Sequence, residues 1–129
     1  MILARESGEQ MEMEDISNNS FMPESCMTGS VEDFYTAMEK EEAHFKKILD
    51  AAKAAGKKLK FVASYDKGKA AVGLQQVDEQ SDFYHLYGKD NIVLFYTNRY
   101  IDQPLVVKGA GAGAEVTASG VFADIIRAA

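Results

Sequence analysis

Hydrophobic positions between residues 30 and 56 recur every three or four residues, the period of a helix with one buried face. Ser30 followed by Asp33 has the spacing of a capping box, and Gly56 is a typical stop signal, so we predict one helix between them. Glu41 and Glu42 interrupt the stripe. They could be paired catalytic carboxylates, and the alternative is a helix face that leaves the core for one turn. The stripe consists of Val31, Phe34, Tyr35, Met38, Phe45, Ile48, Leu49 and Ala52.

Shorter apolar runs in the second half predict β-strands. Leu59–Tyr65 and Ala70–Val77 flank Asp66–Lys69, whose glycine suits a tight turn, so the three segments predict a hairpin. Asn91–Thr97 contains a continuous apolar run and predicts a central strand. Pro104–Lys108 predicts the last strand, because proline is tolerated at the first residue of a strand.

The two ends of the chain have a helical character. Met1–Glu6 predicts a short helix that ends near Gly8, and Ala114–Ala128 predicts a closing helix. Between the first helix and the capping box, Met11–Ile16 alternates and predicts a short, half-buried strand, followed by a loop over residues 17–30. The expected buried stripe of the closing helix is Ala114, Ala118, Val121, Ile125 and Ala128.

This order of elements predicts an α+β fold: a mostly antiparallel sheet with helices packed on one face, plus a C-terminal helix. The length of 129 residues and the 47% hydrophobic content suit one folded domain, and exclude a disordered or disulfide-stapled chain. No apolar run approaches the roughly 18 residues of a membrane helix. We therefore expect no membrane partner.

Charge is distributed unevenly. Residues 1–50 carry 12 acidic and 4 basic side chains, whereas residues 51–129 carry 8 acidic and 10 basic ones. The net charge of −6 disfavours nucleic acid as a partner. The basic cluster predicts a solvated helix end, with an anion-binding patch as the alternative. It consists of Lys53, Lys57, Lys58 and Lys60.

The single cysteine and the two histidines give little support for catalysis or metal binding. Cys26 is alone, so we expect a reducing, cytoplasmic compartment and no nucleophilic thiol, because it lies beside Glu24 without a nearby histidine. His44 and His85 lack the spacing of metal ligands, so we predict no metal site.

The sharpest local motif is the glycine-rich segment 109–113, between the last strand and the closing helix. Gly109, Gly111 and Ala114 fit the spacing of a dinucleotide fingerprint. However, the fingerprint needs a βαβ unit, and Glu115 would oppose a pyrophosphate in the first helical turn. Two interpretations stay open: tight packing of the loop, or contact with a cofactor that is bound mainly elsewhere.

Segment 103–127, QPLVVKGAGAGAEVTASGVFADIIR, resembles the C-terminal signature of homoserine dehydrogenases, most closely the bifunctional aspartokinase/homoserine dehydrogenases. Leu3–Glu6, Glu14–Ile16, Tyr65-Asp66 and Asp90-Asn91 also fall in the family's order, so the resemblance covers nearly the whole chain. It implies the substrate and dimerisation domain of a two-domain dehydrogenase. The family interconverts L-homoserine and L-aspartate 4-semialdehyde with NADP or NAD, in the synthesis of threonine, methionine and isoleucine.

The resemblance also implies roles for individual residues and segments. Gly113 matches a position that contacts the nicotinamide cofactor, with Gly111, Ala114 and Glu115 as neighbouring candidates. The catalytic lysine and the nucleotide-binding domain are expected upstream of Met1, so no catalytic residue is assigned here and the chain alone is expected to be inactive. The expected segments are 1–59 for the end of the substrate region, 60–113 for a dimerising sheet, and 114–129 for a helix returning to the nucleotide-binding domain. The alternative is a stand-alone α+β binding or assembly module.

Overall fold

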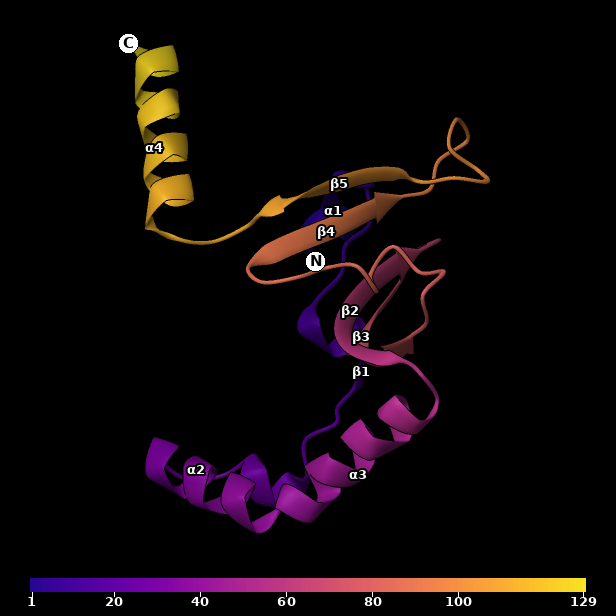
Figure 1. Ribbon diagram of the computed structural model, residues 1–129. Coiled ribbons are helices and arrows are strands. Elements are labelled where there is room, and N and C mark those ends of the chain that lie inside the picture. The colour runs from indigo at the N-terminus through magenta and orange to yellow at the C-terminus, as the bar shows by residue number, and fades with distance from the viewer. The chain divides into compact units, whose positions relative to one another are not determined.

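The computed structural model describes residues 1–129 and divides into two compact units, Met1–Tyr84 and His85–Ala129 (Figure 1). Each unit combines helices with a small β-sheet, which confirms the α+β class and the closing helix. The expected functional segments, with boundaries after residues 59 and 113, do not coincide with these units. They stay predictions.

The sheet of the first unit is built on the predicted hairpin. Strands β2 (Lys58–Asp66) and β3 (Lys69–Val77) pair antiparallel along their whole length. The turn between them has φ of 47° at Lys67 and 77° at Gly68, as a two-residue turn with two left-handed positions requires. The hairpin and its turn are therefore confirmed.

The third strand of this sheet differs from the prediction. β1 (Ile16–Asn19) pairs parallel to β3, so the strand order is β1-β3-β2. The predicted strand over Met11–Ile16 is wrong, because Met13–Asp15 forms a 3₁₀ helix. The Asp15 carboxylate accepts a hydrogen bond of 2.9 Å from the Glu12 backbone N–H, and this local capping closes a turn where the alternation suggested an extended chain.

The predicted long helix is two helices. α2 (Val31–Lys40) and α3 (Glu42–Ala54) meet at Glu41, and Figure 1 shows the change of direction between them. Glu41 accepts a hydrogen bond of 2.8 Å from the Ser25 hydroxyl. The interruption that the apolar stripe shows at this point is therefore a helix boundary.

The start of α2 confirms the capping box. The Ser30 hydroxyl accepts from the Asp33 backbone N–H at 3.2 Å, and the Asp33 carboxylate accepts from the Ser30 backbone N–H and hydroxyl, each at 2.9 Å. The backbone hydrogen bond, followed by the hydroxyl one, lowers the pKa of Asp33 below its ordinary value near 3.8.

We expect acid to weaken this cap. A lowered pKa in the folded state means that the stabilisation is complete above pH 3.8 and is lost as the pH falls below it. Ser30→Ala removes the hydroxyl hydrogen bond and keeps the larger backbone one, so it should raise the pKa of Asp33 only part of the way towards the ordinary value, as an NMR titration of its carboxyl carbon would measure. Ser17→Ala, in β1, is the control and should leave the titration unchanged. An equal titration curve in Ser30→Ala would contradict the cap.

The buried core of the first unit is small. Helix α1 (Ile2–Glu6) buries Ala4, α3 buries Ala52, and the hairpin buries Val62 and Val77. Helix α3 packs against β2, which places helices beside the sheet as predicted. Chain direction after α1 reverses at Gly8, whose φ of 88° favours glycine.

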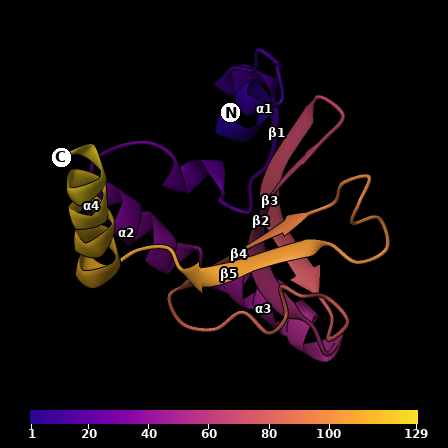
Figure 2. The same ribbon diagram turned by 90° about the horizontal axis from the view of Figure 1, so that it is seen from above.

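The second unit consists of a β-ribbon and the closing helix. β4 (Asp90–Phe95) and β5 (Leu105–Ala110) pair antiparallel, and Figure 2 shows them side by side. The prediction of a central strand is wrong for this chain, because β4 has only β5 as a neighbour. A continuous apolar run indicates that both faces of a strand are apolar. It does not indicate whether the strand has a neighbour on one edge or on both.

Helix α4 (Ala114–Ala128) has the predicted bounds but not the predicted burial. Every residue of α4 is exposed except the half-buried Ala123, and Val121 is 56% exposed. The expected buried stripe is therefore uncovered in this chain. No helix in the structure combines the length and apolar character needed to cross a membrane.

Candidate functional site

The glycine-rich segment connects β5 to α4 and ends in an uncapped helix. Gly113 is the N-terminal cap of α4, and no side chain accepts a hydrogen bond there. The first helical hydrogen bond runs from the Thr117 N–H to the Gly113 carbonyl at 3.1 Å. Since the first N–H groups of a helix have no partner within the helix, Ala114 and Glu115 present theirs at the end of the loop.

Gly113 and Gly111 favour glycine for different reasons. Gly113 has φ 125° and ψ 155°, a backbone region that residues other than glycine rarely adopt. A Cβ at this position would meet nothing within 4 Å. Gly111 has no such backbone angle, but a Cβ there would overlap the Asn91 side-chain amide. Packing against the Asn91 side chain therefore accounts for Gly111, whereas Gly113 has open space around it and a backbone conformation that other residues would adopt only with strain.

The negative charge at the start of α4 bears on which part of a dinucleotide, the phosphates or the nicotinamide, could bind there. Glu115 lies in the first turn, and no basic residue accompanies it there. A carboxylate at this position repels phosphate groups but tolerates a neutral carboxamide and a positively charged ring. The loop also follows an antiparallel ribbon and not a βαβ unit, so it is not a dinucleotide fingerprint. The start of α4 therefore does not suit a pyrophosphate group.

The lysine cluster does not form one binding patch. The Lys58 ammonium donates to the Tyr84 carbonyl at 3.2 Å and lies 3.9 Å from the centre of the Tyr84 ring, so it stabilises the fold of its own unit. Lys53 occupies the last turn of α3, where a positive charge complements the helix dipole. The helix-end interpretation is therefore confirmed for Lys53 and wrong for Lys58 and Lys60, which are half-buried residues of strand β2.

Cys26 and His44 are held by contacts within the fold. Cys26 is 3% exposed and lies in a 3₁₀ helix. The His44 Nε2 lies 2.9 Å from the Phe21 carbonyl oxygen, and its ring packs edge-on against Phe45. No three His, Cys, Asp or Glu side chains gather closely enough to hold a metal ion.

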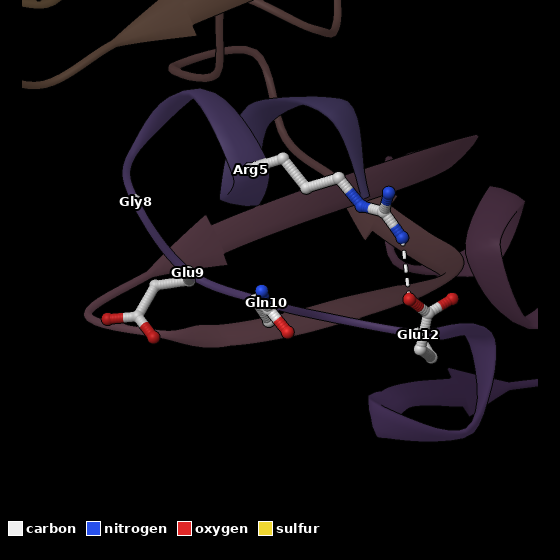
Figure 3. Close-up of a pocket in the computed structure, with 5 residues that line it drawn as sticks. All are labelled: Arg5, Gly8, Glu9, Gln10 and Glu12. Atoms are coloured by element: carbon white, nitrogen blue, oxygen red, sulfur yellow. Dashed lines mark hydrogen bonds and ion pairs between the residues drawn. The ribbon is translucent and has the colours of Figure 1, made fainter.

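A shallow cavity of about 390 Å³ lies beside the first helix (Figure 3). The Arg5 guanidinium donates to the Glu12 carboxylate at 2.6 Å across it, with side-chain exposures of 55% and 64%. Figure 3 shows the Glu9 side chain pointing away from this pair. An exposed ion pair contributes only about 0–1 kcal/mol, and the other acid of the lining, Glu9, does not take part in it, so the glycine loop is the stronger candidate site.

The family model described as homoserine dehydrogenase matches residues 1–126. The chain belongs to the homoserine dehydrogenase family. This agrees with the resemblance that segment 103–127 carries, and it extends the match across both units.

Individual relatives support the same family. The chain is 40% identical over 132 residues to bifunctional aspartokinase/homoserine dehydrogenase 2, chloroplastic, of Zea mays, and matches 100% of itself and 14% of that protein. It is 37% identical to the bifunctional enzyme of Haemophilus influenzae, over 98% of itself and 16% of that protein. It is 44% identical over 96 residues to a homoserine dehydrogenase of Emericella nidulans, over 73% of itself and 26% of that protein.

A crystal structure of a Candida auris protein of unknown function matches with a TM-score of 0.82 and 37% identity, over 98% of this chain and 36% of that one. The chain spans about one seventh of the length of the bifunctional relatives in maize and Haemophilus influenzae. The family is therefore shown, and the activity of a whole homoserine dehydrogenase belongs to the proposal below.

Asn91 is the loop neighbour to which sequence reasoning assigns no role. It lies opposite Gly109 in the β4–β5 register, and its side chain fills the space where a Cβ on Gly111 would be. The resemblance includes Asp90-Asn91, but only the strand register shows that this asparagine lies against the glycine loop.

Proposed function

We propose that this chain is the C-terminal part of an NAD(P)-dependent homoserine dehydrogenase that interconverts L-homoserine and L-aspartate 4-semialdehyde, in the synthesis of threonine, methionine and isoleucine. The observation that carries the proposal is the glycine loop of this chain, a member of the homoserine dehydrogenase family, in which Gly113 has a backbone conformation reserved for glycine and α4 begins without a side-chain cap. The relatives also favour a fusion to an aspartate kinase.

In this proposal the loop approaches the nicotinamide end of NADP or NAD. When bound, the nicotinamide carries the hydride that the reaction transfers. Gly113 permits close approach of the backbone, because it has no side chain and adopts a conformation that glycine favours. The N–H groups of Ala114 and Glu115 are available as donors to a carboxamide oxygen. Gly111 contributes by letting the loop pass close to the Asn91 side chain.

The residue that moves the proton lies outside these 129 residues in this proposal. From the family resemblance we expect a catalytic lysine, together with the nucleotide-binding domain, in a part of the protein before Met1. Residues 1–59 then complete the substrate region, residues 60–113 form the dimerising sheet, and residues 114–129 return to the nucleotide-binding domain. Exposed apolar side chains on the ribbon, including Val93, Phe95 and Val107, support a partner copy at this surface.

We place the protein in the cytoplasm, because a lone cysteine suits a reducing compartment. The maize relative is named as chloroplastic.

The test is an assay of L-homoserine oxidation followed by the absorbance of the reduced nucleotide, with NAD and with NADP. The complete protein that contains this chain and its upstream reading frame should turn over, and the 129-residue chain alone should not. Turnover by the chain alone would overturn the proposal that the catalytic lysine lies outside these 129 residues. A true start codon at Met1, or a complete protein without activity, would instead favour a stand-alone module.

A further inference from the structure

We propose that Asn91 is a positioning residue, which sets the path of the glycine loop and thereby the place of Gly113 against the nicotinamide. This inference rests on the proposed function and adds a residue to its site. Asn91 is the second residue of β4 and pairs across the ribbon with Gly109, just before the loop leaves the sheet.

The evidence is the close approach of Asn91 to Gly111. A Cβ on Gly111 would overlap the side-chain amide nitrogen of Asn91, and would lie 2.8 Å from its Cγ and 3.3 Å from its Cβ. Carbon atoms do not approach so closely without displacement, so the asparagine side chain and the glycine backbone occupy complementary space. Because Asn91 is exposed, rotation about its Cα–Cβ bond would relieve the overlaps with the amide nitrogen and Cγ, whereas the 3.3 Å approach to its Cβ would stay and would require a small displacement of the loop.

The contact between Asn91 and Gly111 lies two residues before Gly113, whose backbone conformation is reserved for glycine. Only Ala112 separates Gly111 from Gly113, so a shift of Gly111 changes the direction in which Gly113 and the start of α4 point. Catalytic sites are sensitive to such shifts, since a displacement of about 1 Å can change rates by about 100-fold.

Asn91 is exposed, in contrast to a core residue. Its replacement removes little buried apolar surface, so we expect little loss of stability. A change in nucleotide binding would therefore indicate a change in the path of the loop and not general unfolding of the protein.

The experiment compares Asn91→Ala, Gly111→Ala and the double variant in the complete protein. We expect Gly111→Ala to raise the KM and the Kd for NADPH about tenfold, because the new methyl group displaces the loop. Asn91→Ala should raise them about threefold, because the loop loses its support. The double variant should resemble Asn91→Ala and not the product of the two effects, since the overlaps with the amide nitrogen and Cγ disappear with the asparagine side chain and only the 3.3 Å approach to the Cβ remains.

Two further measurements separate positioning from structure. The KM for L-homoserine and the melting temperature should stay unchanged in all three variants. Asn98→Ala is the matched control, because Asn98 is an exposed asparagine at the other end of the ribbon, and NADPH binding should not respond to it.

Each outcome decides the inference. Multiplicative effects in the double variant, or unchanged NADPH affinity in both single variants, would overturn the role of Asn91 while the unsubstituted protein still binds NADPH and oxidises L-homoserine. A protein without substitutions that neither binds the nucleotide nor oxidises L-homoserine would overturn the proposed function itself, and the role of Asn91 with it.

Discussion

Replacing Gly113 by valine should raise the KM for the nicotinamide nucleotide at least about tenfold in the complete protein, because the loop can no longer keep its path. Gly113 has φ 125° and ψ 155°, and residues other than glycine pay about 1–3 kcal/mol in this region. That free energy corresponds to roughly a 5- to 150-fold change in an equilibrium constant. Steady-state kinetics with varied NADP or NAD measure the effect.

The reason for this large effect is backbone conformation and not a clash. A Cβ on Gly113 meets nothing within 4 Å, so a substitution finds space but not an acceptable pair of dihedral angles. A β-branched side chain increases the penalty, because its rotation is restricted next to the backbone. The loop and the first turn of α4 must then move, and the N–H groups of Ala114 and Glu115 move with them.

Gly56→Val is the matched control for Gly113→Val. Gly56 follows α3, has φ 66°, and also has open space around a built Cβ. This variant introduces strain of the same kind in the other unit, so it should lower stability and leave the nucleotide KM unchanged. Equal kinetics for Gly113→Val and the unsubstituted protein would favour a loop that serves packing alone.

Replacing Gly73 by alanine should destabilise the first unit by about 2 kcal/mol, the middle of the range for overpacking a filled site. Gly73 is buried in β3, and a Cβ there would lie 2.8 Å from the Asn19 Cβ and 3.0 Å from the Asn19 backbone oxygen. Backbone atoms cannot turn aside as a flexible side chain can, so β1 must shift away from β3.

The free energy of unfolding of the chain in urea, followed by circular dichroism, measures this change. Gly109→Ala is the control, since Gly109 also lies in a strand but a Cβ there has no neighbour within 4 Å. Its effect should stay within about 0.5 kcal/mol. A stability equal to the unsubstituted chain for Gly73→Ala would contradict the close parallel pairing of β1 with β3.

Several elements were predictable because their cause is local. The turn at Lys67-Gly68 follows from the glycine and the flanking apolar strands, and the start of α2 follows from Ser30 and Asp33, whose groups bond to each other. Helix α4 also begins where the glycine-rich segment ends. In each case the interacting groups lie within a few residues, so the pattern of residue types is sufficient.

The wrong predictions concern features that the pattern of residue types does not settle. The alternation over Met11–Ile16 is real, but the bond between Asp15 and the Glu12 backbone competes with an extended chain. The helix boundary at Glu41 is supported by Ser25, which lies 16 residues earlier. The expected stripe of α4 marks a face that is apolar, but burial requires a neighbour that this chain does not place there.

The sequence by itself determined the family, the α+β class, the hairpin and the glycine loop as the candidate site. The tertiary structure decided that β1 runs parallel to β3, and that Asn91 lies against Gly111. It also decided that Gly111 is a packing requirement, whereas Gly113 is a conformational one. The physical reason is that such contacts depend on strand register and on distances between residues far apart in the chain, and residue types alone do not specify these.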